Sequence, residues 1–180
     1  MKLNKQTTLL LVIDLQPFLL KLLKKAKPYA PDQVLETNEK LITMITNAGI
    51  PSVLVSVTQK FLPRKLRQKS THLAVSKDLL SHSKVTTYTK YQPSAYTIPE
   101  LRDFLEQQNI ETTILTGVVT NNGVFKTAKD LLSAGYKVIV MEDAATARTQ
   151  KLHDQSIEKL KALGATIQTS DFLIDMIWLS

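Results

Sequence analysis

The feature that most constrains this fold is a series of six short apolar runs, rich in β-branched residues, that alternate with segments of helical periodicity. The runs lie at residues 8–13, 52–57, 85–88, 112–116, 137–141 and 165–169. Helical spacing of apolar residues is clearest over residues 34–45, 124–132 and 152–163. Strands that alternate with helices predict an α/β domain, because each crossover helix covers one face of a mostly parallel sheet.

We expect a three-layer α/β/α sandwich whose six-stranded, mostly parallel sheet is doubly wound in the order 3-2-1-4-5-6. Gly49, Gly135 and Gly164 each follow a helical segment, where a residue with positive φ commonly ends the helix. A chain of 180 residues buries roughly 70% of its unfolded surface, so its core needs no disulfide or metal. Residues 1–180 are therefore interpreted as a single domain.

The sequence contains no cysteine, which excludes disulfides, thiolate metal sites and a cysteine nucleophile. The N-terminus is basic and apolar, but Asp14, Gln16 and Pro17 interrupt the apolar run and no small-residue cleavage site follows. We interpret this segment as the first strand in preference to a signal peptide. No window reaches about 18 uninterrupted apolar residues, so we expect no membrane span and a cytoplasmic protein.

The formal net charge is +7, with basic clusters at residues 21–27 and 64–69. Such clusters are compatible with a nucleic-acid or polyanion partner. We favour a solvated helix face for the first cluster and an exposed loop for the second, because neither is interleaved with aromatic residues that could stack on bases. Nucleic-acid binding therefore ranks below the other functional hypotheses.

In the predicted topology, strands 1 and 4 are neighbours, and ligands bind beyond the carboxyl ends of strands at this switch point. Strand 1 ends at Asp14, strand 4 ends at Gly117, and the next helix begins near Gly123. Lys90 follows strand 3. The sequence therefore predicts that these residues gather at one edge of the sheet.

Two candidate residues each have an ordinary structural explanation as well. In a partly dry crevice the Asp14 carboxyl would have a raised pKa, as a general acid or base requires, whereas the alternative is a helix cap ahead of Pro17. Lys90 could keep that carboxylate charged or stabilise an anionic substrate. Taken alone, a lysine at a strand end is usually solvated.

The segment from Thr120 to Val124 is expected to form the first turn of a helix, whose unpaired N–H groups can bind an anion or oxyanion. The side chain of Thr120 or Asn121 is the expected N-cap. Gly123 would allow a ligand to approach closely, or is simply tolerated in a frayed first turn.

The remaining polar candidates do not indicate a metal or cofactor. His72, His82 and His153 lack metal-binding spacing, and residues 57–67 after strand 2 contain no carboxylate or histidine. Asp143, in the sequence EDA after strand 5, is interpreted as a hydrogen-bond acceptor that fixes a loop. We expect no catalytic metal and no cofactor.

Four motifs in order make the chain resemble the isochorismatase-like hydrolase family of the cysteine hydrolase superfamily, over nearly its full length. They are VIDLQ at the end of strand 1, K-x-x-x-S-A-Y at residues 90–96, GVVTN at residues 117–121, and EDA at residues 142–144. In the amidase branches the resemblance implies a triad of aspartate, lysine and cysteine. These positions correspond to Asp14, Lys90 and Gly123, so the nucleophile is missing and cysteine-dependent amidase activity is not expected.

The resemblance carries further implications for the site. It implies a cis peptide between Val118 and Val119 that helps backbone N–H groups of Val119 and Thr120 form an oxyanion site. The aspartate and histidine metal site of nicotinamidases has no counterpart here. True isochorismatases also have glycine at the cysteine position and hydrolyse a vinyl ether, with Gln59 in the approximate place of a substrate-binding glutamine. The residues before the glycine, however, follow the amidase pattern.

We therefore consider two leading hypotheses. The first is acid/base hydrolysis of a small anionic metabolite of the vinyl-ether type, without a covalent intermediate, with Asp14 as proton donor and Lys90 as electrostatic partner. The alternative is a catalytically inactive family member that binds a small molecule or acts as an oligomeric interaction protein. The resemblance implies a homo-oligomer, and the apolar tail at residues 172–179 suits either an interface or a last helix that covers the sheet.

Overall fold

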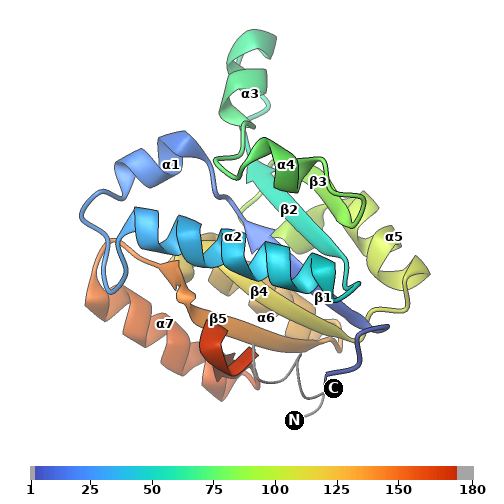
Figure 1. The fold of residues 1–180 in the computed structure, drawn as a ribbon. Coiled ribbons are helices and arrows are strands. Elements are labelled where there is room, and N and C mark those ends of the chain that lie inside the picture. The colour runs from blue at the N-terminus through green and yellow to red at the C-terminus, as the bar shows by residue number, and fades with distance from the viewer. Residues whose placement is uncertain (1–2, 174–180) are drawn as a thin grey trace.

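The computed structural model describes residues 3–173 and contains a six-stranded sheet with helices on both faces (Figure 1). The strands are β1 (Thr8–Ile13), β2 (Ser52–Val57), β3 (Val85–Lys90), β4 (Thr112–Val118), β5 (Lys137–Thr146) and β6 (Thr166–Gln168). All neighbouring strands are parallel, in the order β3-β2-β1-β4-β5-β6. The predicted fold class and strand order are confirmed.

Helices cover both faces of the sheet, with α2 in front of it and α6 behind it in Figure 1. They are α1 (Pro17–Leu22), α2 (Pro31–Asn47), α3 (Arg64–Ser70), α4 (Lys77–Leu80), α5 (Pro99–Gln107), α6 (Phe125–Ser133) and α7 (Gln150–Ala162). Side chains of β1 alternate between two cores: Leu10 and Val12 pack on the α2 side, and Leu9 and Leu11 pack on the side of α5, α6 and α7. Burial on both faces explains why this strand is apolar throughout.

Three predicted helix ends are confirmed, whereas one segment that was expected to be a loop is helical. Gly49, Gly135 and Gly164 all have positive φ, as expected for residues that end helices. The basic run at residues 64–69, however, was expected to be a loop and instead forms helix α3. Its arginine, lysine, leucine and glutamine residues are good helix formers, and this intrinsic helix propensity explains the difference.

Strand β5 is longer than its apolar run, which ends at Met141. It continues to Thr146 through a register shift opposite the segment between Leu115 and Gly117 of β4. Asp143 therefore lies in this irregular part of the strand and not after it, whereas its predicted role as a hydrogen-bond acceptor is confirmed. Its carboxylate accepts a hydrogen bond from the backbone N–H of Ser170, at 2.9 Å, and so fixes the chain that follows β6.

Two expectations concern membrane contact and the C-terminus. Within residues 3–173, no helix has the length and apolar character needed to cross a bilayer. Of the apolar tail at 172–179, only the first two residues are described: Leu173 is buried in the core on the α2 side, and Phe172 is partly exposed. Residues 174–179 lie outside the described part of the chain, so the role expected for this tail stays a prediction.

Candidate active site

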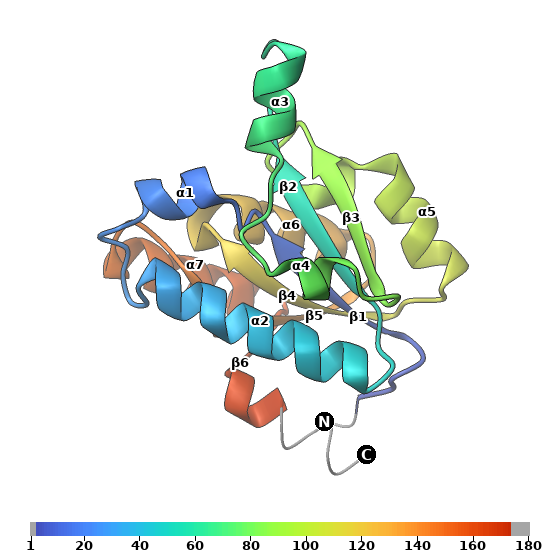
Figure 2. The same ribbon diagram turned by 45° about the horizontal axis from the view of Figure 1, so that its top comes forward.

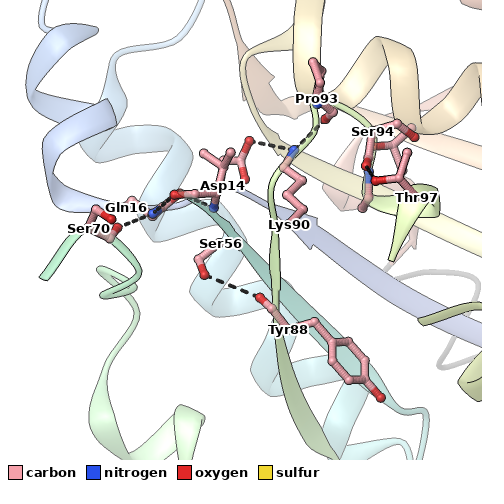
Figure 3. Close-up of polar contacts among 12 residues, drawn as sticks. Asp14, Gln16, Ser56, Ser70, Tyr88, Lys90, Pro93, Ser94 and Thr97 are labelled. Atoms are coloured by element: carbon pink, nitrogen blue, oxygen red, sulfur yellow. Dashed lines mark hydrogen bonds and ion pairs between the residues drawn. The ribbon is translucent and has the colours of Figure 1, made fainter. Parts of the chain in front are cut away.

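Asp14 and Lys90 meet at the edge of the sheet where β1 and β3 end. Their side chains form an ion pair, with 2.8 Å between Lys90 Nζ and Asp14 Oδ2 (Figure 3). They converge because β1, β2 and β3 are parallel neighbours, so that their carboxyl ends lie at one edge. The expected gathering of these two residues is thus observed, whereas the alternative for Asp14 as a helix cap is not: Gln16 is the N-cap residue of α1.

The backbone at Asp14 adopts an unusual conformation that directs the side chain. Asp14 has φ of 58°, in the left-handed region that few residues other than glycine occupy. Its N–H donates to Val55 O at 2.8 Å, and its carbonyl accepts from Gln16 N at 2.8 Å. Such conformations persist only where surrounding structure holds them, and they cluster at functional sites. Hydrogen bonds on both sides of the residue supply that support.

Lys90 is nearly inaccessible, with 1% of its surface exposed. Its ammonium group donates to the Pro93 carbonyl oxygen at 2.6 Å in addition to pairing with Asp14 (Figure 3). The ammonium group at the end of the long side chain is therefore held by two partners. A solvated lysine, the ordinary expectation for a strand end, is excluded by this burial.

Burial changes the acidity of both members of the pair. Loss of solvation raises the pKa of Asp14 from its ordinary value of 3.8 to about 6, even though Lys90 acts in the opposite direction. Burial likewise lowers the pKa of Lys90, and Asp14 opposes that change. Among the described residues Asp14 Oδ1 has no hydrogen-bond partner, while Oδ2 is held by Lys90. A proton on this carboxyl group therefore belongs on Oδ1.

Gly123 lies against the ion pair, inside a π-helical turn formed by Thr120–Val124 that leads into α6. A Cβ atom built on Gly123 would stand 3.1 Å from Asp14 Oδ2, 3.2 Å from Lys90 Nζ and 3.0 Å from Ile13 Cγ2. A side chain at this position would thus point directly at the pair and crowd it. Glycine allows the carboxylate and the ammonium group to occupy this space in direct contact.

The pair lies at the floor of a cavity of about 970 Å³, a volume that suits a small organic ligand. Asp14, Lys90 and Gly123 contribute to its lining, as do the predicted ligand-binding residues Val119 and Gln59. Most of the remaining wall is apolar and comes from α1, α3 and the segment after β3. Charged groups in an apolar cavity of this kind mark a candidate binding or active site.

A second cavity, of about 710 Å³, lies beside α2 and α4. Its charged side chains include Glu36 and Lys40, which pair with each other on the exposed surface of α2 at 2.7 Å. It has no buried ion pair and no strained backbone residue among its lining. We therefore place the candidate site in the cavity at the switch point.

The predicted role of the Thr120–Val124 segment needs correction. The Thr120 side chain is not the N-cap but is fully buried and forms a 2.9 Å hydrogen bond with Nδ1 of His153 on α7. The N-cap position belongs to Val119, which has no capping side chain, so Asn121 is not the cap either. The N–H groups of Asn122 and Val124 both donate to Val119 O, at 3.0 and 3.4 Å. These two amides are therefore engaged, and the predicted ligand-binding residue Thr120 is not among the residues that line the cavity.

The peptide bond between Val118 and Val119 is cis, as the resemblance implied.

Gln16 is a structural residue of the site that the sequence analysis missed. Its side chain is fully buried, donates to Val57 O at 3.0 Å and to Ser70 O, and accepts from Val57 N at 2.9 Å (Figure 3). It therefore ties the start of α1 to the end of β2 and the end of α3. A polar residue directly after a buried apolar strand was the available signal, but its partners are 41 and 54 residues away in sequence.

Among residues 3–173, no group of three or more histidine, aspartate and glutamate side chains is arranged to hold a metal ion.

Comparison with known proteins identifies relatives of this chain. A model of the isochorismatase domain family matches residues 8–172. The uncharacterized isochorismatase family protein YecD of Escherichia coli O157:H7 is 26% identical over 189 residues, which cover 98% of this chain and 100% of that protein.

Solved structures share the fold. An isochorismatase-family structure from Chromobacterium violaceum superposes with a TM-score of 0.84 at 17% identity and covers 100% of this chain and 98% of its own. The YcaC gene product of Escherichia coli, described as an octameric hydrolase of unknown specificity, has a TM-score of 0.75 at 17% identity and covers 93% and 78%.

Proposed function

This chain belongs to the isochorismatase family, and we propose that it hydrolyses a small anionic metabolite of the vinyl-ether type by acid/base chemistry without a covalent enzyme intermediate. The observation that carries the proposal is the buried pair of Asp14 and Lys90, in contact at 2.8 Å at the floor of an open, ligand-sized cavity. Gly123 leaves no nucleophile between them. The chemistry must then use water.

In the proposed reaction the Asp14 carboxyl group donates its proton to the vinyl carbon that does not carry the ether oxygen. Water attacks the resulting oxocarbenium ion and gives its proton back to the Asp14 carboxylate, which restores the acid. The hemiketal then breaks its C–O bond to the leaving group, and its hydroxyl proton passes to the departing oxygen, which yields a ketone and an alcohol. Overall, one vinyl ether and one water molecule give one alcohol and one ketone. A pKa of about 6 gives Asp14 both a protonated fraction near neutral pH and the acid strength the first step needs.

Lys90 has an electrostatic role in this scheme. Its ammonium group at 2.8 Å stabilises the carboxylate left after proton donation and attracts an anionic substrate into an otherwise apolar cavity. Gln59 and Val119 are proposed to contact the substrate, since both line the cavity. Thr120 is assigned no contact with the substrate, because its side chain bonds to His153 and the residue does not line the cavity.

The test is turnover of isochorismate by the purified protein and by Asp14→Asn. We expect the variant to lose at least about 100-fold in kcat/KM, the usual contribution of a general acid. The matched control is Asp103→Asn, which removes an exposed carboxylate on α5. Turnover by Asp14→Asn at the wild-type rate would contradict the proposal.

The pH profile gives a second test. A proton donor must be protonated before reaction, so kcat/KM should decrease as the pH rises through about 6, the pKa of Asp14. A rate that increases across the same range would assign Asp14 as a base and contradict its role as donor.

A second candidate function is binding without chemistry. The Lys90 ammonium group is already paired with Asp14 and donates to Pro93 O, so its charge is compensated without a substrate. Saturable binding of isochorismate or related anions, with no turnover of these or of a panel of amides, would favour this alternative.

We also propose that the chain forms a homo-oligomer, supported by the octameric assembly described for YcaC, which shares its fold. Light scattering after size-exclusion chromatography measures the assembled mass, and a monomer at micromolar concentration would contradict this part of the proposal.

A further inference from the structure

Positive charge is concentrated at the edge of the sheet that holds the cavity. The segments that follow β1 to β4, at residues 14–31, 58–77, 91–99 and 119–129, contain four, six, no and two basic residues, twelve in total, and one acidic residue, Asp14. The rest of the chain has the remaining 11 of 23 basic residues and 15 of the 16 acidic ones. These segments therefore carry a net charge of +11 against −4 for the rest of the chain, and Lys69 among their basic residues lines the cavity.

Helix α3 extends this positive surface away from the body of the protein, as Figures 1 and 2 both show. None of its residues is buried, and it carries Arg64, Lys65, Arg67 and Lys69. Only its last residue is fixed, through the Ser70 carbonyl that accepts a hydrogen bond from Gln16. The fold thus presents a basic arm beside the cavity that contributes little to the core.

Aromatic side chains lie among these charges. Phe61, directly before α3, is 81% exposed, and Phe18 on α1 and Tyr91 after β3 are 41% and 39% exposed. Phe18 and Tyr91 line the cavity. Lys60 Nζ lies 5.3 Å from the centre of the Tyr91 ring, in cation–π contact. In the sequence, the basic clusters have no aromatic residues among them, which is why nucleic acid ranked low. The fold places Tyr91 against Lys60, close in sequence to the cluster at 64–69.

We call the surface formed by α3, Lys60 and the aromatic residues Phe61, Phe18 and Tyr91 the rim of the cavity. We propose that the rim binds single-stranded nucleic acid, with bases stacked on the three aromatic rings and phosphates paired with Lys60 and the basic residues of α3. A charged groove with aromatic platforms is the usual arrangement for single strands, because only unpaired bases expose their faces for stacking. A second copy of this chain is a poorer occupant, because two rims of the same charge repel each other. The amides of Gln59, Gln68 and Gln92, which line the cavity mouth, also suit bases better than lipid tails.

This binding is separate from the chemistry proposed for Asp14 and Lys90 and is measured without turnover. Fluorescence anisotropy of a labelled single-stranded oligonucleotide of about 16 nucleotides, titrated with the whole protein at several salt concentrations, gives affinity and salt slope. Arg64→Gln combined with Arg67→Gln should reduce the slope of log affinity against log salt by about 1.4, since each phosphate contact on a single strand contributes about 0.7. Phe61→Ala should weaken binding about 5- to 100-fold by removing one stacking platform.

The matched control is Lys159→Gln combined with Lys161→Gln, which removes the same charge from the exposed end of α7 next to the start of β6. The control should keep the wild-type salt slope, and a duplex of equal length should bind more weakly than the single strand. Equal effects of both double variants, equal affinity for the duplex, or no binding at low salt would overturn the proposal. The proposal would also be overturned if the protein sedimented with anionic phospholipid vesicles but did not bind the oligonucleotide.

Discussion

The floor and the rim of the cavity differ sharply in how the protein holds them. At the floor, Asp14 and Lys90 are 6% and 1% exposed and are fixed by an ion pair and by strand ends. At the rim, Phe61 and Leu66 are 81% and 52% exposed, and α3 buries no residue. The ends of the strands therefore fix the geometry of the floor. The apolar and basic side chains of the rim, in contrast, make few contacts within residues 3–173 that would explain their presence. This difference agrees with our two proposals, chemistry at the floor and a partner at the rim.

The largest effect is expected beneath the floor, at Gly117. This residue has φ of +108°, and a Cβ atom built on it would lie 2.0 Å from Ile13 O on the neighbouring strand. Gly117→Ala should cost at least about 4 kcal/mol in free energy of unfolding, because backbone must move to relieve the clash. Urea denaturation measures the loss. Gly135→Ala is the control, since Gly135 also has positive φ but open space around it, and equal losses in the two variants would contradict this explanation.

The next effect tests the ion pair. Lys90→Met leaves the Asp14 carboxylate buried without its partner, which should cost about 3 kcal/mol at pH 8. Because Lys90 lowers the pKa of Asp14, its removal raises that pKa above the present value of about 6. A carboxyl whose folded-state pKa exceeds its ordinary 3.8 is tolerated when protonated and loses stability as the pH rises through the folded-state pKa. The destabilisation should therefore be smaller at pH 5 than at pH 8.

Urea unfolding at both pH values measures the difference between Lys90→Met and the wild-type protein. Lys40→Met removes a lysine from the exposed pair with Glu36 and should leave stability almost unchanged at either pH. A loss for Lys90→Met that is larger at pH 5 than at pH 8 would mean that Asp14 does not determine it.

The smallest effect is expected at the rim. Leu66→Gln should change the free energy of unfolding by no more than about 0.5 kcal/mol, because Leu66 is half exposed on a helix that buries nothing. Thermal or urea unfolding at two protein concentrations provides the measurement. A loss that appears only at high concentration would show that this surface packs against another copy of the chain.

Much of the fold was predictable because its signals are local. Burial on both faces makes parallel strands apolar, and the glycines at positions 49, 135 and 164 mark helix ends through their own backbone preference. Errors arose where local pattern and tertiary context differ. Strand β5 continues past its apolar run through a register shift, and the threonine at 120 bonds to a histidine on a distant helix instead of capping its own.

The sequence by itself determined the strand order, the absence of a cysteine nucleophile, and the position of Asp14, Lys90 and Gly123 at one edge of the sheet. Only the tertiary structure decided that the two charged side chains touch, that burial raises the pKa of Asp14 to about 6, and that Gly123 leaves them that space. It also decided that Tyr91 contacts Lys60, which lies about thirty residues earlier in the sequence. Composition and periodicity report each segment's own preferences, whereas distance and desolvation between segments exist only after folding.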